Sequence, residues 1–451
     1  MENGEWKMEN GEWNKDYGKE WDIFAGDSRF RGNDGTVAGD SPSPFSILQL
    51  SIKMKRFGNL IEKVADMDNI RYAFYLASKG KHRKQAVQEW LFGDMEQEFV
   101  KIRNDFLNQS VRVGKYNSFK VYEPKERVIY AAEFRDRVVQ HALMNVCHEI
   151  FDRFQIADSY ACRVGKGQYK ALEKAQENSR KMQWFVKLDI RKYFDNIDHE
   201  VLKQMLRRKI KDPFVLDAFD RIIDSYQCPH PGEGGFSRGE RGEREEDAEN
   251  AGTLPCLPAC PSRQCRHSRE SGNLLQHQGI AAQVPHDGTT HYPLSTNHYP
   301  PKGLPIGNLT SQYFANFYLG HADHFIKETL KTQHYARYMD DMLLWGNDKE
   351  TLLLKVEKLR DFIQNQLHLE LKEICLNRTS RGLSFLGYRV FHHALKLTRA
   401  SKKRYIKKIT LYRKLYEKNI WTEKEYHAHA APLTAFVLKA DTLGLRKKLL
   451  K

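Results

Sequence analysis

Three aspartates stand beside apolar stretches, where a carboxylate is costly to keep without a partner. Asp189 ends the run 185–188, and the adjacent Asp340 and Asp341 have apolar residues on both sides. The first pattern predicts a buried strand that ends at an acid, and the second predicts a hairpin with two acids at its tip. Buried acids need a cation or hydrogen bonds to offset their desolvation. Two Mg²⁺ ions about 3.5–4 Å apart, as used in phosphoryl transfer, would meet that need.

The same acids could instead be ordinary turn residues, because Asp is common in turns. In combination, however, they resemble the reverse transcriptase family, in which a palm strand carries the first Asp and a Tyr-Met-Asp-Asp box, here residues 338–341, carries the others. The resemblance covers roughly residues 58–228 and 302–450. It implies an α/β right-hand polymerase fold with fingers over 54–175, a palm over 176–395 and a helical thumb over 396–451.

The resemblance also implies a reaction. Asp189, Asp340 and Asp341 would be catalytic and hold two Mg²⁺ ions, with Mn²⁺ as the alternative ion. The primer 3′-hydroxyl would attack the α-phosphate of a dNTP, and pyrophosphate would leave. The expected partners are an RNA template, a DNA or RNA primer and dNTPs, with a small basic accessory protein as a further candidate. The expected activity is therefore that of an RNA-directed DNA polymerase.

Composition agrees with a polyanionic partner. The 451 residues include 73 Lys and Arg against 58 Asp and Glu, a formal charge of +15, which suits nucleic acid. Charge alone would also fit a ribosome-bound or membrane-surface protein. Apolar runs all fall short of the roughly 18–20 residues that span a bilayer. The seven Cys have no framework spacing, which favours a reducing compartment and a cytoplasmic location.

Two stretches look foreign to this pattern. Residues 1–53 open on a direct seven-residue repeat and are then rich in Gly, Asp, Ser and Pro, which predicts a disordered or spurious N-terminal extension. Residues 229–301 have little apolar periodicity, so we expect a disordered insertion there. A zinc site is the alternative for the insertion, but its spacing lacks the usual Cys-x₂-Cys pair; the candidate ligands are Cys256, Cys260, Cys265 and His267.

Apolar periodicity predicts the elements around the acids. A helix should start near Met54, with Phe57, Leu60, Ile61 and Val64 on one face. A strand pair is expected over 111–116 and 119–122, continuing over 123–130, and a helix should open at Phe134. Further helices are expected over 200–210, 313–330 and 349–367, and residues 400–451 should be basic and helical.

Several residues match nucleotide contacts of the family. Arg127, with Lys125 as its companion, matches the basic residue that contacts the incoming triphosphate, and Arg can grip phosphate bidentately. Either could instead be a solvated strand charge. Phe194 matches the aromatic that sterically excludes the ribose 2′-hydroxyl, although a core position is the alternative.

The loop at Ile306 and Gly307 bears on the subtype. Most reverse transcriptases have Gln-Gly-x₃-Ser-Pro here, whereas this chain has Ile-Gly-x₃-Ser-Gln. That departure resembles the enzymes of diversity-generating retroelements, in which an aliphatic side chain removes a polar contact near the nascent base pair. We therefore expect error-prone copying. The alternatives are a defence-associated or group II intron-like reverse transcriptase, or an inactive RNA-binding remnant disrupted by the insertions.

A Phe-Leu-Gly-Tyr sequence follows the acids. Its residues Phe385, Leu386, Gly387 and Tyr388 resemble the primer grip, a hairpin that holds the primer 3′ end. The alternative is a core strand with a glycine bulge.

Overall fold

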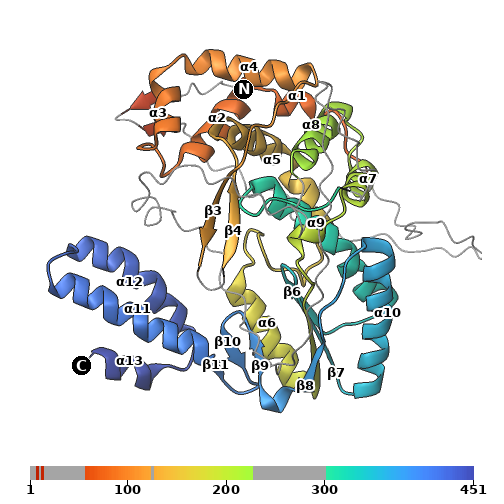
Figure 1. Ribbon diagram of the computed structural model, residues 1–451. Helices are drawn as coiled ribbons and strands as arrows, with labels where there is room; N and C mark the ends of the chain where they lie inside the picture. Colours follow the sequence, from red (N-terminus) through yellow and green to blue (C-terminus); the bar gives the residue numbers. More distant parts are fainter. Residues whose placement is uncertain (1–6, 10–11, 15–55, 123–125, 227–300, 451) are drawn as a thin grey trace, which may run out of the picture. The chain divides into compact units, whose positions relative to one another are not determined.

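A computed structural model describes residues 7–9, 12–14, 56–122, 126–226 and 301–450 (Figure 1). Lys125, the predicted insertion except its last residue, and almost all of the predicted N-terminal extension lie outside these residues. The chain divides into two compact units. The first holds Met1–Gly114, Glu133–His148 and Arg208–Phe219, and the second holds Lys115–Ala132, Glu149–Arg207 and Asp220–Lys451.

The first unit is mainly helical. It contains α1 (Ile61–Val64), α2 (Met67–Ser78), α3 (Gln85–Phe92), α4 (Met95–Leu107), parts of α5 (Phe134–Phe154), α7 (His199–Lys209) and α8 (Pro213–Asp224), and the short pair β1 (Lys7–Glu9) and β2 (Glu12–Asn14). Aromatic rings of α2, α4 and α5 meet in its core, where Phe74 contacts Phe99 and Phe134 edge-on at 5.6 and 5.7 Å between centroids.

The predicted helix with Phe57 on its apolar face is wrong in its first half. Asn59 has φ of 56°, a left-handed conformation that a helix cannot contain. Helix α1 therefore begins at Ile61, and Phe57 forms a β-bridge with Ile210 instead. The Asp212 carboxylate accepts hydrogen bonds from the first backbone N–H groups, including that of Ile61 at 3.0 Å, so a side chain far along the chain fixes this helix start.

A two-stranded sheet in the second unit is shorter than predicted. Strand β3 (Asn117–Val121) pairs antiparallel with β4 (Arg127–Ala131). Residues 111–116 are not a strand, because the Gly114 N–H donates to the Asp136 carboxylate at 2.8 Å instead of joining a ladder. The helix expected at Phe134 is confirmed as α5.

The central sheet of the second unit has the strand order β6-β7-β5-β8, and all its pairs are antiparallel. Its strands are β5 (Trp184–Leu188), β6 (Tyr335–Tyr338), β7 (Asp341–Gly346) and β8 (Cys375–Arg378). Helix α6 (Gln168–Lys181) contacts β6 and β7, and α10 (Lys349–Leu367) contacts β7 (Figure 1). The Trp345 indole N–H donates to Ser179 Oγ of α6 at 3.1 Å.

A second sheet of three short strands shares a core with the central one. Strands β9 (Leu383–Phe385), β10 (Tyr388–Val390) and β11 (Leu395–Leu397) lie in the order β11-β10-β9. One buried cluster includes Leu172 of α6, Phe185 of β5 and Phe385 of β9. Helix α6 therefore contacts strands of both sheets. Three helices complete this end of the chain: α11 (Arg399–Glu417), α12 (Glu423–Leu438) and α13 (Leu443–Leu450).

The helices predicted over 200–210, 313–330 and 349–367 are confirmed, the first two with shifted ends. Helix α10 spans the predicted residues 349–367, and α7 starts at His199. Helix α9 (Leu309–His324) starts earlier than 313 and continues as a π-helical turn, η2 (Phe325–Thr329). Short 3₁₀ turns are η1 (Phe194–Asn196) and η3 (Thr379–Arg381). In the part of the chain that the structure describes, we find no helix long and apolar enough to cross a membrane.

Candidate active site

Asp189 lies directly after β5, as predicted. The strand is buried on one face by Val186 and Leu188, which are fully inaccessible, and on the other by Phe185, which is 2% exposed, so it delivers its next residue to the sheet end with little freedom. The Lys372 backbone N–H donates to the Asp189 carbonyl at 2.8 Å, and its ammonium group donates to Asp189 Oδ2 at 2.8 Å. Asp189 Oδ1 is buried and has no hydrogen-bond partner among the described residues.

The other two acids lie at the tip of the β6–β7 hairpin. Tyr338 pairs with Asp341, which leaves Met339 and Asp340 as the two-residue turn. Met339 has φ of 54°, the left-handed conformation that tight hairpin turns use. The predicted hairpin is therefore confirmed, although Asp341 is the first residue of β7 rather than part of the turn.

Asp341 is held by a lysine from the neighbouring strand. Lys187 Nζ lies 2.8 Å from Asp341 Oδ1, and their side chains are only 15% and 18% exposed. Strand β5 pairs with β7 so that Leu188 faces Met342. The pairing places Asp189 and Asp341 at the same end of two adjacent strands.

The three carboxylates share one electrostatic environment. Burial first, and then the negative charges of Asp341 and Asp189, together raise the pKa of Asp340 to about 6. Like charges held this close disfavour one another's ionisation. A site with this property gains stability from any cation that enters it.

The residues fit a divalent cation, but they are not assembled as a cage. No group of three His, Cys, Asp or Glu side chains in the described ranges converges closely enough to hold a metal ion. The carboxylates are nevertheless of the type that Mg²⁺ prefers. The buried, partnerless Oδ1 of Asp189 and the raised pKa of Asp340 are the observations that fit a metal ligand.

The predicted nucleotide residues Arg127, Ile306 and Gly307 lie along β4 and the loop beside it. Arg127 is exposed at the start of β4. The Tyr130 N–H donates to the Ile306 carbonyl at 2.8 Å. Gly307 has φ of 127°, and a Cβ there would lie 2.8 Å from the Tyr130 carbonyl oxygen. Glycine is therefore required for the loop to approach β4 this closely.

Phe194 and its neighbour Tyr193 differ in exposure. Tyr193 is 4% exposed and its hydroxyl donates to the Ala315 carbonyl of α9, so Tyr193 is a core residue. Phe194 is only partly buried in η1, where its carbonyl accepts from the Leu304 N–H at 2.8 Å. Partial exposure leaves the Phe194 ring available for a contact with a ligand. Steric exclusion of a ribose 2′-hydroxyl by this ring stays a prediction.

The predicted primer grip forms a second tight hairpin. Phe385 pairs with Tyr388 across a turn of Leu386 and Gly387, whose φ values are 48° and 84°. All four residues are buried. The Tyr388 hydroxyl donates to the Phe436 carbonyl of α12 at 2.6 Å. The hairpin tip thus packs against α12, and a primer contact there stays a prediction.

Sequence reasoning assigned no role to a buried charge in β6. Arg337 is fully inaccessible and forms an ion pair with the equally buried Asp323 of α9, at 2.7 Å between Nη2 and Oδ2. A signal was present, since Arg337 is a charged residue inside a short buried strand. The partners of Lys187 and Lys372 were also missed, because the pairings join segments distant in sequence.

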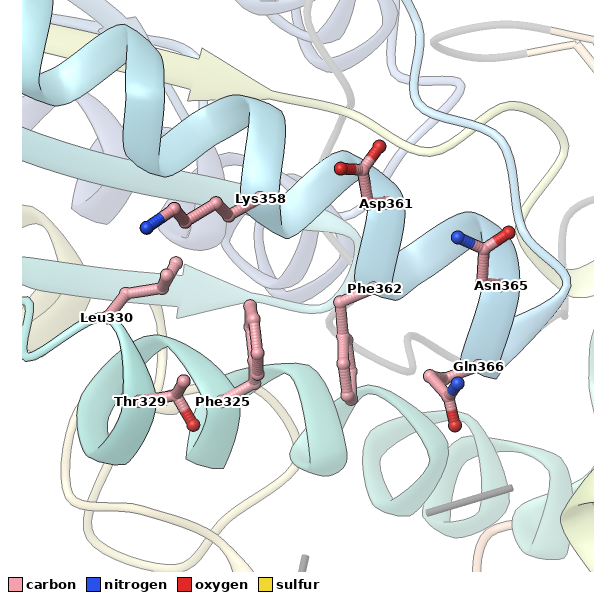
Figure 2. Close-up of a pocket in the computed structure, with 8 residues that line it drawn as sticks. All are labelled: Phe325, Thr329, Leu330, Lys358, Asp361, Phe362, Asn365 and Gln366. Carbon is pink, nitrogen blue, oxygen red and sulfur yellow. The ribbon is translucent and has the colours of Figure 1, made fainter. Parts of the chain in front are cut away.

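A separate groove of about 400 Å³ lies between η2 and α10. Phe325 and Phe362 are stacked in it, 4.3 Å apart and inclined by 10°, and polar side chains such as Lys358 and Asp361 lie at its edge (Figure 2). None of the three aspartates lines it.

Comparison with known proteins gives distant relatives. The group II intron-encoded protein LtrA of Lactococcus lactis subsp. cremoris is 23% identical over 348 residues, 72% of this chain and 54% of the relative. The chain is thus similar in sequence to a group II intron-encoded protein over part of that protein's length. The putative COX1/OXI3 intron 1 protein of Saccharomyces cerevisiae is 22% identical over 165 residues, 36% of this chain and 20% of that protein.

Another relative carries the name of a maturase. Nuclear intron maturase 1 of Arabidopsis thaliana is 26% identical over 128 residues, which cover 27% of this chain and 18% of the maturase. No protein-family model matches the chain. The chain spans about half the length of LtrA, so the likeness concerns part of that protein.

Proposed function

We propose that this protein is an RNA-directed DNA polymerase with a right-hand polymerase fold. The observation that carries the proposal is the placement of Asp189, Asp340 and Asp341 at one end of the central sheet, where burial and then the charges of Asp341 and Asp189 raise the pKa of Asp340 to about 6. Its support is the kinship with group II intron-encoded proteins. The basic surplus of the chain, +15, suits an RNA template and a DNA or RNA primer.

Each named side chain has a role in this proposal. Asp189, Asp340 and Asp341 hold two Mg²⁺ ions, or Mn²⁺. The chemistry that such ions supply when bound is activation of the primer 3′-hydroxyl and stabilisation of the leaving pyrophosphate. Arg127, exposed at the start of β4, binds the triphosphate of the dNTP, and Phe194 excludes a ribose 2′-hydroxyl by steric contact.

Primer extension on an RNA template tests the proposal. The purified full chain should add dNTPs to an annealed DNA primer in Mg²⁺, and Asp340→Asn should lower the rate by roughly 10³-fold, the loss of several kcal/mol of transition-state stabilisation. Binding of the primer–RNA duplex should change little, because the carboxylate serves chemistry rather than phosphate contact. RNA binding without any extension by the unmodified chain would favour the alternative, an inactive RNA-binding remnant.

The subtype has two candidates. The names of the relatives favour a group II intron-like reverse transcriptase. Ile306 favours the error-prone enzyme of a diversity-generating retroelement, because an aliphatic side chain cannot hydrogen-bond a base or sugar. The Ile306 carbonyl accepts a hydrogen bond from the Tyr130 N–H, which fixes the backbone of this loop. A substitution of Ile306 would therefore change copying fidelity through its side chain alone.

Ile306→Gln separates the two candidates. Restoring one polar contact is worth about 1–3 kcal/mol, so misincorporation should fall by roughly 5- to 150-fold, most visibly opposite template adenine. Sequencing of cDNA made by both variants on one adenine-rich RNA measures this. Equal error spectra would remove the support for the error-prone subtype and leave reverse transcription itself untouched.

A further inference from the structure

The buried Arg337 side chain uses all of its donors. A guanidinium group has five N–H donors in a planar fork. Nε donates to both Asp323 oxygens, at 2.8 and 2.9 Å, and Nη2 donates to Asp323 Oδ2 at 2.7 Å. Nη2 also contacts Gln155 Oε1 at 2.9 Å and Ser159 Oγ at 3.0 Å. The group is thus fixed by two segments that both precede it in sequence, helix α9 and residues 155–159.

The remaining edge of the same group reaches the acid-bearing turn. Arg337 Nη1 donates to the Met339 carbonyl at 3.1 Å and to Asn316 Oδ1 at 3.0 Å. The Met339 carbonyl belongs to the peptide group that joins Met339 to Asp340. Because a peptide group is planar, holding its oxygen also fixes the N–H and Cα of Asp340. The point from which the Asp340 side chain leaves the backbone therefore depends on the guanidinium position.

Stability alone does not explain this arrangement. Burial of the ion pair is complete, with both side chains at 0% exposure. The desolvation of two such charges commonly equals or exceeds their attraction, so packed apolar residues often give an equal or higher stability. Burial itself lowers the pKa of Arg337, but Asp323, followed by Tyr335 and Tyr193, offsets this and the net shift of the pKa is upward. The charged Arg337 side chain is therefore retained, despite the free-energy cost of its desolvation, in contact with the turn that holds Met339 and Asp340.

The backbone of Arg337 joins the same region. Its N–H donates to the Asp158 carbonyl at 2.9 Å, and its carbonyl accepts from the Tyr160 N–H at 3.0 Å. Asn316 Nδ2 donates to the Ala161 carbonyl at 3.1 Å. Segment 155–161, helix α9 and the hairpin are thus joined through one side chain.

We propose that Arg337, anchored by Asp323, is a positioning residue that fixes the Asp340 carboxylate for catalysis by holding the Met339–Asp340 peptide group. This inference rests on the proposed function. Arg337 touches neither substrate nor metal in this role. It acts through the turn, so its loss should lower turnover rather than nucleic-acid binding.

Arg337→Lys is the variant that tests the proposal. Lysine keeps the charge but has three donors and no planar fork, so it cannot hold Asp323 and the Met339 carbonyl at once. We expect kcat for single-nucleotide addition to fall by about 10- to 100-fold, the scale for misplacing a reacting group by about 1 Å. The KM for dNTP and the Kd for primer–RNA should stay within about twofold of the unmodified protein.

Tyr318→Phe is the matched control. Tyr318 lies on α9, the helix that carries Asp323, and is fully buried, and in the variant the hydroxyl that donates to the Leu367 carbonyl at 2.7 Å is lost. Its melting temperature should fall while kcat stays near that of the unmodified protein. A second readout is the Mg²⁺ concentration that gives half-maximal thermal stabilisation, which should rise in Arg337→Lys and stay constant in Tyr318→Phe.

The outcomes separate this inference from the proposed function. Absence of extension by the unmodified chain sinks the proposed function. Extension with an equal kcat for Arg337→Lys overturns the positioning role alone. Should Arg337→Lys fail to fold, Asn316→Ala removes the acceptor that shares Nη1 with the Met339 carbonyl. A kcat reduced about threefold or more at constant KM supports the role, and an unchanged kcat overturns it.

Discussion

Two hairpins of the second unit have tight two-residue turns but differ in the chemical character of their tips. The β6–β7 turn holds Met339 and Asp340, and the β9–β10 turn holds Leu386 and Gly387. Both have left-handed residues, yet the first concentrates negative charge while the second is packed into an apolar core. Turn geometry therefore does not decide the role of a hairpin tip. The neighbouring elements decide it.

The neighbours of each tip account for the contrast. Lys187 and Lys372 lie against the acids of the central sheet. At the other tip, Phe436 of α12 lies near Gly387, and Leu386 is 5% exposed. An acid is tolerated where cations can reach it and is costly where only apolar groups surround it.

Leu386→Asp transplants an acid into the apolar tip and should have the largest effect. Asp accepts the left-handed conformation, so backbone strain does not contribute. The lost apolar volume and the buried carboxyl group together should lower the free energy of unfolding by about 4 kcal/mol or more. Chemical denaturation measures this, with Leu386→Met as the volume-conserving control, expected to lose less than about 1.5 kcal/mol. A loss of under 1 kcal/mol for the Asp variant would break the comparison.

Asp340→Asn should raise the free energy of unfolding instead of lowering it, and the size of the gain should depend on pH. The pKa of Asp340 is raised from 3.8 to about 6 in the folded chain, so the folded state binds its proton more tightly than the unfolded state. This group therefore lowers stability progressively as pH rises from about 4 through 6. The variant removes that loss, so it should gain up to about 3 kcal/mol at pH 7.5 and almost nothing at pH 4. Unfolding at both pH values without Mg²⁺ measures the gain, and an equal effect at both would contradict the assignment.

Gly387→Ala tests how tightly the apolar tip is packed. A left-handed alanine costs about 1–2 kcal/mol, and the new Cβ would lie 3.0 Å from Phe436 Cζ and Ser401 Oγ. The melting temperature should fall accordingly. Gly444→Ala is the control, because that helical glycine has open space around it and alanine there should stabilise by roughly 0.5–1 kcal/mol. Equal effects at the two glycines would count against tight packing at this tip.

Lys372→Ala should have the smallest effect. The Lys372–Asp189 pair is 44% and 37% exposed, and exposed pairs contribute about 0–1 kcal/mol. Lys187→Ala provides the contrast, since its pair with Asp341 is less than half as exposed and should contribute more. Thermal unfolding of both variants tests this order. A larger loss of stability for Lys372→Ala than for Lys187→Ala would contradict our account of the ion pairs beside Asp189 and Asp341.

Local signals in the sequence predicted local structure well. The strand ending at Asp189 and helix α10 were both predicted, and Asp348 caps that helix by accepting from the Thr351 N–H at 2.7 Å. The strand at 111–116 was wrong because a distant carboxylate, Asp136, binds its backbone. Apolar alternation carries no information about such a partner.

The candidate site was predictable only in part. The acids followed from their apolar neighbours, but the buried environment of Arg337 depends on α9 and on segment 155–161, which the chain places beside β6 only when folded. The partners of Lys187 and Lys372 likewise come beside them only when the sheet has formed. Charge pairing across strands is a property of register, and register is set by the whole sheet.

The position of β5 in the central sheet has a consequence for protein engineering. Strand β5 lies between β7 and β8, and it precedes residue 227, whereas β6, β7 and β8 follow residue 300. Pro301 is the first residue described after Tyr226, and its carbonyl accepts from the His199 N–H at 3.2 Å. A chain divided between Tyr226 and Pro301 would therefore give two fragments, and neither alone could complete the sheet. Co-expressed halves would regain the acidic site only by assembling, which makes this position suited to a split-protein reporter.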